Sequence, residues 1–126
     1  ESDYDPKRVD EITNNILSNN DKLAYIFNLI KSMSPIGIRK IGLENDIIQN
    51  SNMEAFDLGK IQCPTMIIHG KHDADVTLHH AGYLATNIPH AEKLIVEDGF
   101  HILPVSNSYM DVHKQRLAFL NKYRPY

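Results

Sequence analysis

The sequence predicts an α/β fold in which an aspartate and a histidine each follow the carboxyl end of a strand. A continuous apolar run at residues 66–68 is followed by Asp73, and a second β-rich run at residues 94–96 is followed by His101. Continuous apolar runs are typical of strands that are buried on both faces of a parallel sheet. In such folds the loops after the strands carry the chemistry. These two loops are therefore the candidate functional site.

Length and composition fit one modest soluble domain. The chain has 126 residues, of which 42% are hydrophobic and 23% are charged, as is ordinary for a globular protein. A net charge of -3, without a cluster of Lys or Arg, argues against nucleic acid as a partner. No apolar run approaches the roughly 20 residues that span a bilayer, so we expect no membrane segment. Cys63 is the only cysteine, which excludes an internal disulfide and fits a cytoplasmic location.

The first third of the chain has helical patterns. An aspartate followed by a proline at residues 5–6 is a helix-start signal, and this helix is expected to end near Asn19. Asp21 is expected to cap a second helix, which ends at residues 34–35. We expect the two helices to form an αα-hairpin with one apolar face. The apolar stripe of the second helix consists of Leu23, Ile26, Phe27, Ile30 and Met33.

Residues 35–49 have a shorter apolar pattern. It predicts one or two short helices, broken near Gly42 and Asn45. Residues 51–59 are mostly polar and predict a loop or a ragged helical turn. A boundary between two layers of the structure is expected near this loop.

The remainder of the chain predicts strand, helix, strand and helix in that order. Gly70 ends the first strand, and Thr77 is expected to cap a helix that Pro89 stops. After the second strand, a helix is expected from Tyr109 to about Lys122. This order implies two parallel strands joined by a right-handed crossover. The carboxyl ends of neighbouring parallel strands lie at the same edge of the sheet.

Asp73 and His101 at that edge are suited to acid–base chemistry. A carboxylate that accepts the imidazole Nδ1–H fixes the tautomer of the ring. The other ring nitrogen then acts as general base for a nucleophile and later as general acid for the leaving group. Two alternatives stay open: Asp75 is a rival acid, and Asp73 and His101 can be an ordinary turn cap and a partly buried loop histidine.

The other histidines invite a metal-site interpretation, but their spacing does not favour one. No predicted helix places two of them at i and i+4 with a third ligand in reach, as a zinc site prefers. Residues 70–72 lack the glycine spacing of a phosphate-binding loop. We therefore predict neither a metal nor a cofactor. The histidines considered are His69, His72, His79, His80, His90 and His113.

Four segments together resemble the C-terminal part of an α/β-hydrolase. Residues 67–76 read Ile-Ile-His-Gly-Lys-His-Asp-Ala-Asp-Val and match the family's acid segment, an apolar run followed by His-Gly-x-x-Asp-x-x-Val. Residues 81–91 match the following helix, Ala-x-x-Leu-Ala-x-x-Ile-Pro-x-Ala. Residues 99–101, Gly-Phe-His, are similar to the family's histidine loop, and residues 34–46 resemble the end of its cap region.

The resemblance implies roles for particular residues and segments. Asp73 would be the catalytic acid and His101 the catalytic base. Residues 1–50 would form a helical lid, and residues 51–126 the C-terminal part of the hydrolase core. The reaction implied is hydrolysis of a small ester, amide or related acyl substrate, without a cofactor.

Two features depart from the family pattern. Phe100 stands where many relatives have a small residue, and it is expected to narrow the space beside His101. No serine lies in the Gly-x-Ser-x-Gly elbow that presents the nucleophile. We therefore expect the chain to be part of a longer protein and to be inert by itself.

Several interpretations of the longer protein stay open. A serine nucleophile would make it an esterase or a related hydrolase, whereas an aspartate nucleophile would make it a dehalogenase or an epoxide hydrolase. A non-catalytic, hydrolase-like binding protein is the alternative from another class. An unpaired sheet edge or the apolar lid is expected to drive homo-oligomer formation.

Overall fold

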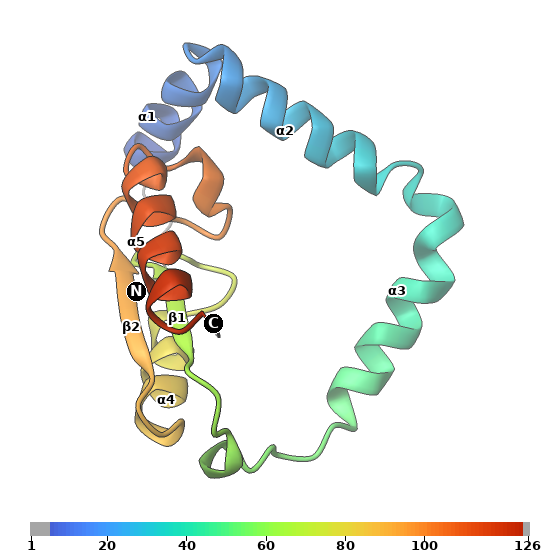
Figure 1. The fold of residues 1–126 in the computed structure, drawn as a ribbon. Coiled ribbons are helices and arrows are strands. Elements are labelled where there is room, and N and C mark those ends of the chain that lie inside the picture. The colour runs from blue at the N-terminus through green and yellow to red at the C-terminus, as the bar shows by residue number, and fades with distance from the viewer. Residues whose placement is uncertain (1–5, 125–126) are drawn as a thin grey trace.

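Two parallel strands and the helix between them form the centre of the body. The computed structural model describes residues 6–124. β1 (Met66–Gly70) pairs with β2 (Glu92–Val96), with Met66 opposite Glu92 and Gly70 opposite Val96. α4 (Leu78–Asn87) connects the two strands (Figure 1). The predicted order of strand, helix and strand, with parallel pairing, is confirmed.

A small apolar core joins these elements to the C-terminal helix. α5 (Tyr109–Lys122) follows a 3-10 turn, η2 (Leu103–Val105). The buried apolar side chains come from both strands, from α4 and its end, and from these two later elements. They are Ile67, Val96, Ala81, Ile88, Val105 and Val112.

Polar contacts hold the far end of α5 against the start of β2. The Glu92 carboxylate accepts hydrogen bonds from Lys122 Nζ at 2.7 Å and from the Tyr123 hydroxyl at 3.0 Å. The predicted end of this helix near Lys122 is confirmed. α5 is therefore tied to the sheet at its C-terminal end, and the histidine loop precedes its N-terminal end.

The first two helices are joined by a short connection that is capped differently from the prediction. α1 (Pro6–Leu17) ends before Asn19, whose side-chain oxygen accepts the N–H groups of Asp21 and Lys22 and so caps α2 (Asn20–Met33). The expectation that Asp21 is the cap is wrong, because α2 begins two residues earlier than expected and the side chain of Asn19 binds two free N–H groups of its first turn. The cap predicted at Asp5 lies outside the described residues.

α3 (Ile36–Ser51) is one continuous helix, so the predicted break near Gly42 and Asn45 is wrong. A single glycine in a helix costs only about 1 kcal/mol relative to alanine, which a helix of this length tolerates. Lys40 and Glu44 form an i,i+4 pair at 3.6 Å across the glycine. Gly42 and Asn45 therefore led to a predicted break in the helix, but the free-energy cost of such residues is too small to cause one.

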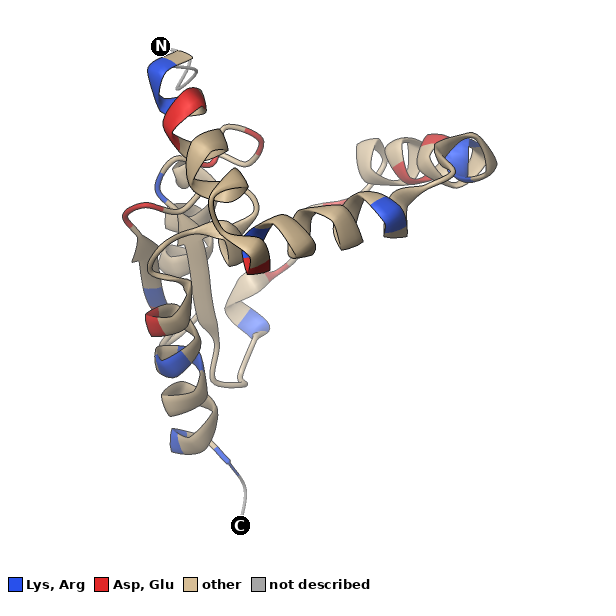
Figure 2. Ribbon diagram, turned by 90° about the horizontal axis from the view of Figure 1, so that it is seen from above, with Lys and Arg blue, Asp and Glu red and all other residues tan. Residues whose placement is uncertain are grey.

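The helices α2 and α3 form an arm that leaves the body and returns to it through residues 52–65 (Figure 1). Figure 2 shows α2 running away from α1 rather than along it. The two helices therefore lie together only where they join, and not side by side as the expected hairpin would. Every residue from 31 to 57 is exposed, including all of α3. A short 3-10 turn, η1 (Leu58–Lys60), follows before β1. Over residues 6–124, no helix combines the length and the apolar character needed to cross a membrane.

Candidate acid–histidine site

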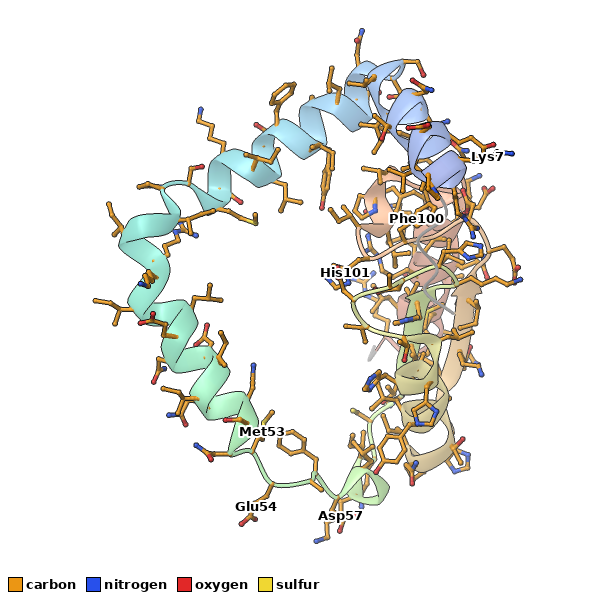
Figure 3. All side chains as sticks on the ribbon, turned by 180° about the vertical axis from the view of Figure 1, so that it is seen from behind. Lys7, Met53, Glu54, Asp57, Phe100 and His101 are labelled. Atoms are coloured by element: carbon orange, nitrogen blue, oxygen red, sulfur yellow. The ribbon has the colours of Figure 1, made fainter. Side chains whose placement is uncertain are left out.

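Asp73 and His101 meet beyond the carboxyl ends of the two strands. The Nδ1 atom of His101 lies 3.2 Å from Oδ1 and 3.1 Å from Oδ2 of Asp73. Because a carboxylate only accepts, Nδ1 carries the proton in this contact. The Asp73 side chain is 7% exposed and that of His101 is 54% exposed. The acid is therefore enclosed, while the imidazole is open to the side of the body that faces the arm (Figure 3).

The loop after β1 holds the Asp73 carboxylate through its own backbone. Oδ1 accepts the N–H of Asp75 at 3.0 Å and the N–H of Val76 at 2.9 Å. Burial alone would raise the pKa of Asp73, but the hydrogen bonds from Val76, His101 and Asp75, with the charge of His101, outweigh it and lower that pKa. Asp73 is thus ionised and oriented at neutral pH.

A second aspartate anchors the loop that carries His101. The Asp98 carboxylate accepts the backbone N–H of Asn107 at 2.6 Å, the N–H of Ser108 at 3.1 Å, and the Ser108 hydroxyl. Burial would raise the pKa of Asp98, yet these hydrogen bonds lower it overall. The loop from β2 to α5 is consequently closed at its base by one side chain.

Phe100 bridges three segments beside His101. Its ring centroid lies 5.9 Å from that of His72 in the acid loop, and the Arg8 guanidinium of α1 lies 5.6 Å from its centre. Arg8 is placed for a cation–π contact, which contributes about 0.5–1 kcal/mol at an exposed site. Phe100 therefore connects the first helix to both loops of the site.

Comparison with known proteins identifies the family. A model of the family described as "Serine hydrolase (FSH1)" matches residues 18–112. The chain belongs to the FSH1 serine hydrolase family. The match covers both loops of the site and begins just before α2. The predicted resemblance to an α/β-hydrolase is confirmed.

A solved structure supports the same conclusion for the fold. An "Alpha/beta hydrolase fold protein from Nakamurella multipartita" is 25% identical, with a TM-score of 0.79. The similarity covers 95% of this chain and 42% of that chain. The chain therefore spans less than half the length of that structure, and its fold is a partial α/β-hydrolase fold. No curated protein matches the chain.

The structure brings Asp73, not Asp75, into hydrogen-bonding contact with His101. The Asp75 carboxylate still lies close: one ligand atom each from Asp73, Asp75 and His101 lie within 4.8 Å of one another. His101 is not one of the histidines that were considered as metal ligands from the sequence. A divalent cation held by this group would compete with His101 for the Asp73 carboxylate, so in a serine hydrolase it would oppose the acid–histidine contact.

Sequence reasoning missed two residues that support the site. His69 Nε2–H donates to the Val76 carbonyl at 2.8 Å and lies 3.9 Å from Asp73 Oδ2, so it braces the acid loop. A histidine at a strand end carries no signal for this role. The sequence identifies Asp98 only as an acidic residue that follows a strand. Its hydrogen-bond partners lie 9 and 10 residues later in the chain, so no local pattern predicts them.

Proposed function

We propose that the chain supplies the acid and the base of the catalytic triad of a serine hydrolase, with Asp73 as the acid and His101 as the base. The hydrogen bond between His101 Nδ1 and the enclosed Asp73 carboxylate, with the rest of the ring exposed, carries this proposal. Membership of the FSH1 family favours a serine nucleophile over an aspartate. The substrate class is a small ester, amide or related acyl compound.

The geometry suits proton transfer at Nε2 of His101. Since Nδ1–H is held by Asp73, Nε2 is the free base. It removes the proton of the serine hydroxyl as the oxygen bonds to the acyl carbon, and it then gives that proton to the leaving group as the acyl bond breaks. In the second half, His101 takes a proton from water as the water oxygen bonds to the acyl carbon, and it gives that proton to the serine oxygen as the acyl–serine bond breaks. Asp73 stays ionised throughout and stabilises the imidazolium.

We further propose that the nucleophile comes from outside these 126 residues, so that the chain alone is inert. The sequence has no Gly-x-Ser-x-Gly segment. Within residues 6–124, His101 hydrogen-bonds to Asp73 and to no serine hydroxyl. The limited coverage of the similar solved hydrolase supports the same proposal.

We further propose that residues 1–50, which include α1 and most of the arm, act as a lid over the substrate. Residues 51–126 would be the part of the core that carries the acid and the base. Figure 3 shows His101 on the edge of the body that faces α2 and α3. The stripe on α2 exposes Phe27, Ile30 and Met33, and these apolar side chains are suited to contact an acyl chain.

Labelling with a fluorophosphonate probe tests the proposed function. The longer protein is treated with the probe, and the modified residue is mapped by mass spectrometry. His101→Ala is the test variant, and His79→Ala, an exposed histidine on α4, is the matched control. We expect a serine outside these residues to be labelled in the unmodified protein and in the control. Labelling of this serine should be strongly weakened in His101→Ala. Absence of labelling, or equal labelling in all three, would overturn the proposal.

A further inference from the structure

The last residue of β1 lies directly against the histidine loop. A Cβ atom added to Gly70 would lie 2.6 Å from the carbonyl carbon of Gly99 and 2.6 Å from the carbonyl oxygen of Phe100. A Cβ added to Gly99 would lie 2.7 Å from the Leu103 Cδ2, 2.8 Å from the Val96 Cβ and 2.9 Å from the Gly70 Cα. Both glycines are buried. The two loops therefore touch through backbone atoms, with no room for a side chain.

Backbone hydrogen bonds from the two residues after Gly70 join the loops next to this contact. Lys71 N–H donates to the Val96 carbonyl at 2.9 Å, and His72 N–H donates to the Gly99 carbonyl at 2.9 Å. Asp73 follows His72 directly, and His101 is two residues after Gly99. The acid and the histidine therefore each lie within two residues of a backbone hydrogen bond that joins the two loops.

Backbone conformation does not explain why these positions hold glycine. No glycine of the chain has a positive φ, the region in which glycine is favoured over other residues. Glycine is required at both positions because the absence of a side chain lets the two loops approach each other closely.

We propose that Gly70 and Gly99 are positioning residues, whose direct backbone contact sets the distance between Asp73 and His101. This proposal rests on the proposed function of that pair. Ordinary van der Waals contact begins at 3.4 Å, so a Cβ at 2.6 Å requires the loops to separate by about 0.8 Å. The Nδ1 to carboxylate distances, 3.1 and 3.2 Å, are already at the long end for a hydrogen bond. A separation of that size breaks the contact.

Nitrogen NMR of the histidine rings in the longer protein tests this inference. The protonation of each ring nitrogen is read from its ¹⁵N shift near neutral pH. The variants are Gly70→Ala and Gly99→Ala, with Gly82→Ala as the matched control, since nothing lies within 4 Å of a Cβ added to that α4 glycine. We expect His101 to carry its proton on Nδ1 in the parent and the control, and to lose this signature in both test variants while circular dichroism stays unchanged.

Each other outcome has a definite meaning. Retention of the Nδ1–H signature in both test variants overturns the positioning role and leaves the proposed function intact. Loss of the folded state in both, with Gly82→Ala folded, makes the glycines structural and also overturns the positioning role. Absence of the signature in the parent itself contradicts the acid–histidine pair, and with it the proposed function.

Discussion

Replacing Asp98 by alanine should destabilise the chain, because one carboxylate closes the base of the histidine loop. The variant loses three hydrogen bonds, from Asn107 N–H, Ser108 N–H and the Ser108 hydroxyl. Hydrogen bonds to a charged group contribute about 1.5–3 kcal/mol each when buried, whereas truncation of a helix cap costs about 0.5–2 kcal/mol. Asp98 is only partly buried, so we expect a loss of about 2 kcal/mol. For a chain of this size that lowers Tm by about 8 °C.

The effect of Asp98→Ala should also depend on pH. The pKa of Asp98 is lowered in the folded chain from 3.8. A lowered carboxyl pKa contributes stability that is complete above the unfolded value and is lost as pH falls through the folded value. The difference in Tm between parent and variant should therefore be full at pH 6 and should shrink below about pH 3.8.

Thermal unfolding followed by circular dichroism measures both effects. Asp111→Ala is the matched control, because Asp111 is an exposed aspartate in the first turn of α5, the helix that follows the histidine loop, and pairs with Lys114 at 2.8 Å. Such an exposed pair contributes at most about 1 kcal/mol. Equal Tm losses in the two variants, or a loss for Asp98→Ala that is the same at pH 6 and at pH 3, would show that the ionised Asp98 does not hold the histidine loop.

Two further predictions concern the surface. Contacts with Glu92 and Tyr123 raise the pKa of Lys122 to about 12, so the stability from this contact is present below the unfolded value near 10.5 and is lost as pH rises through 12. Glu92→Gln should move the Lys122 titration, followed by NMR, back toward 10.5, and an unchanged titration would count against the contact. The side chains of Ile38 and Ile41 on α3 are 81% and 80% exposed, and large apolar patches promote association. We expect light scattering at micromolar concentration to give a mass above 14.4 kDa, and the substitution Ile41→Glu to lower that mass. A monomeric mass for the unmodified chain would rule out this association.

The central crossover was predictable because its signals are local. Two continuous apolar runs, a glycine after the first and Pro89 before the second define strand, helix and strand without knowledge of distant contacts. Parallel neighbours place their carboxyl ends at one edge, so the meeting of Asp73 and His101 followed from topology. The structure agrees with both expectations.

The supports of the site were not predictable because they join residues whose local patterns carry no mark of the contact. The Asp98 partners lie 9 and 10 residues away in the next helix cap, and the contact of Gly70 with Gly99 depends on the register of two strands. The wrong predictions for the N-terminal helices have another cause. Both Asn19 and Asp21 are suitable N-cap residues for α2, and the free-energy cost of Gly42 in a helix is too small to end α3.

Hydrolysis of a p-nitrophenyl ester by the longer protein shows whether Asp73 is the triad acid, when the variant Asp73→Asn is compared with Asp75→Asn. Asparagine at the triad acid leaves a similar shape but removes the carboxylate that holds the imidazole tautomer, which lowers kcat by about 10⁴ in a serine protease. We expect a loss of this order for Asp73→Asn, in a protein that remains folded, and nearly full activity for Asp75→Asn. Full activity of Asp73→Asn, or the large loss in Asp75→Asn instead, would show that Asp73 is not the triad acid.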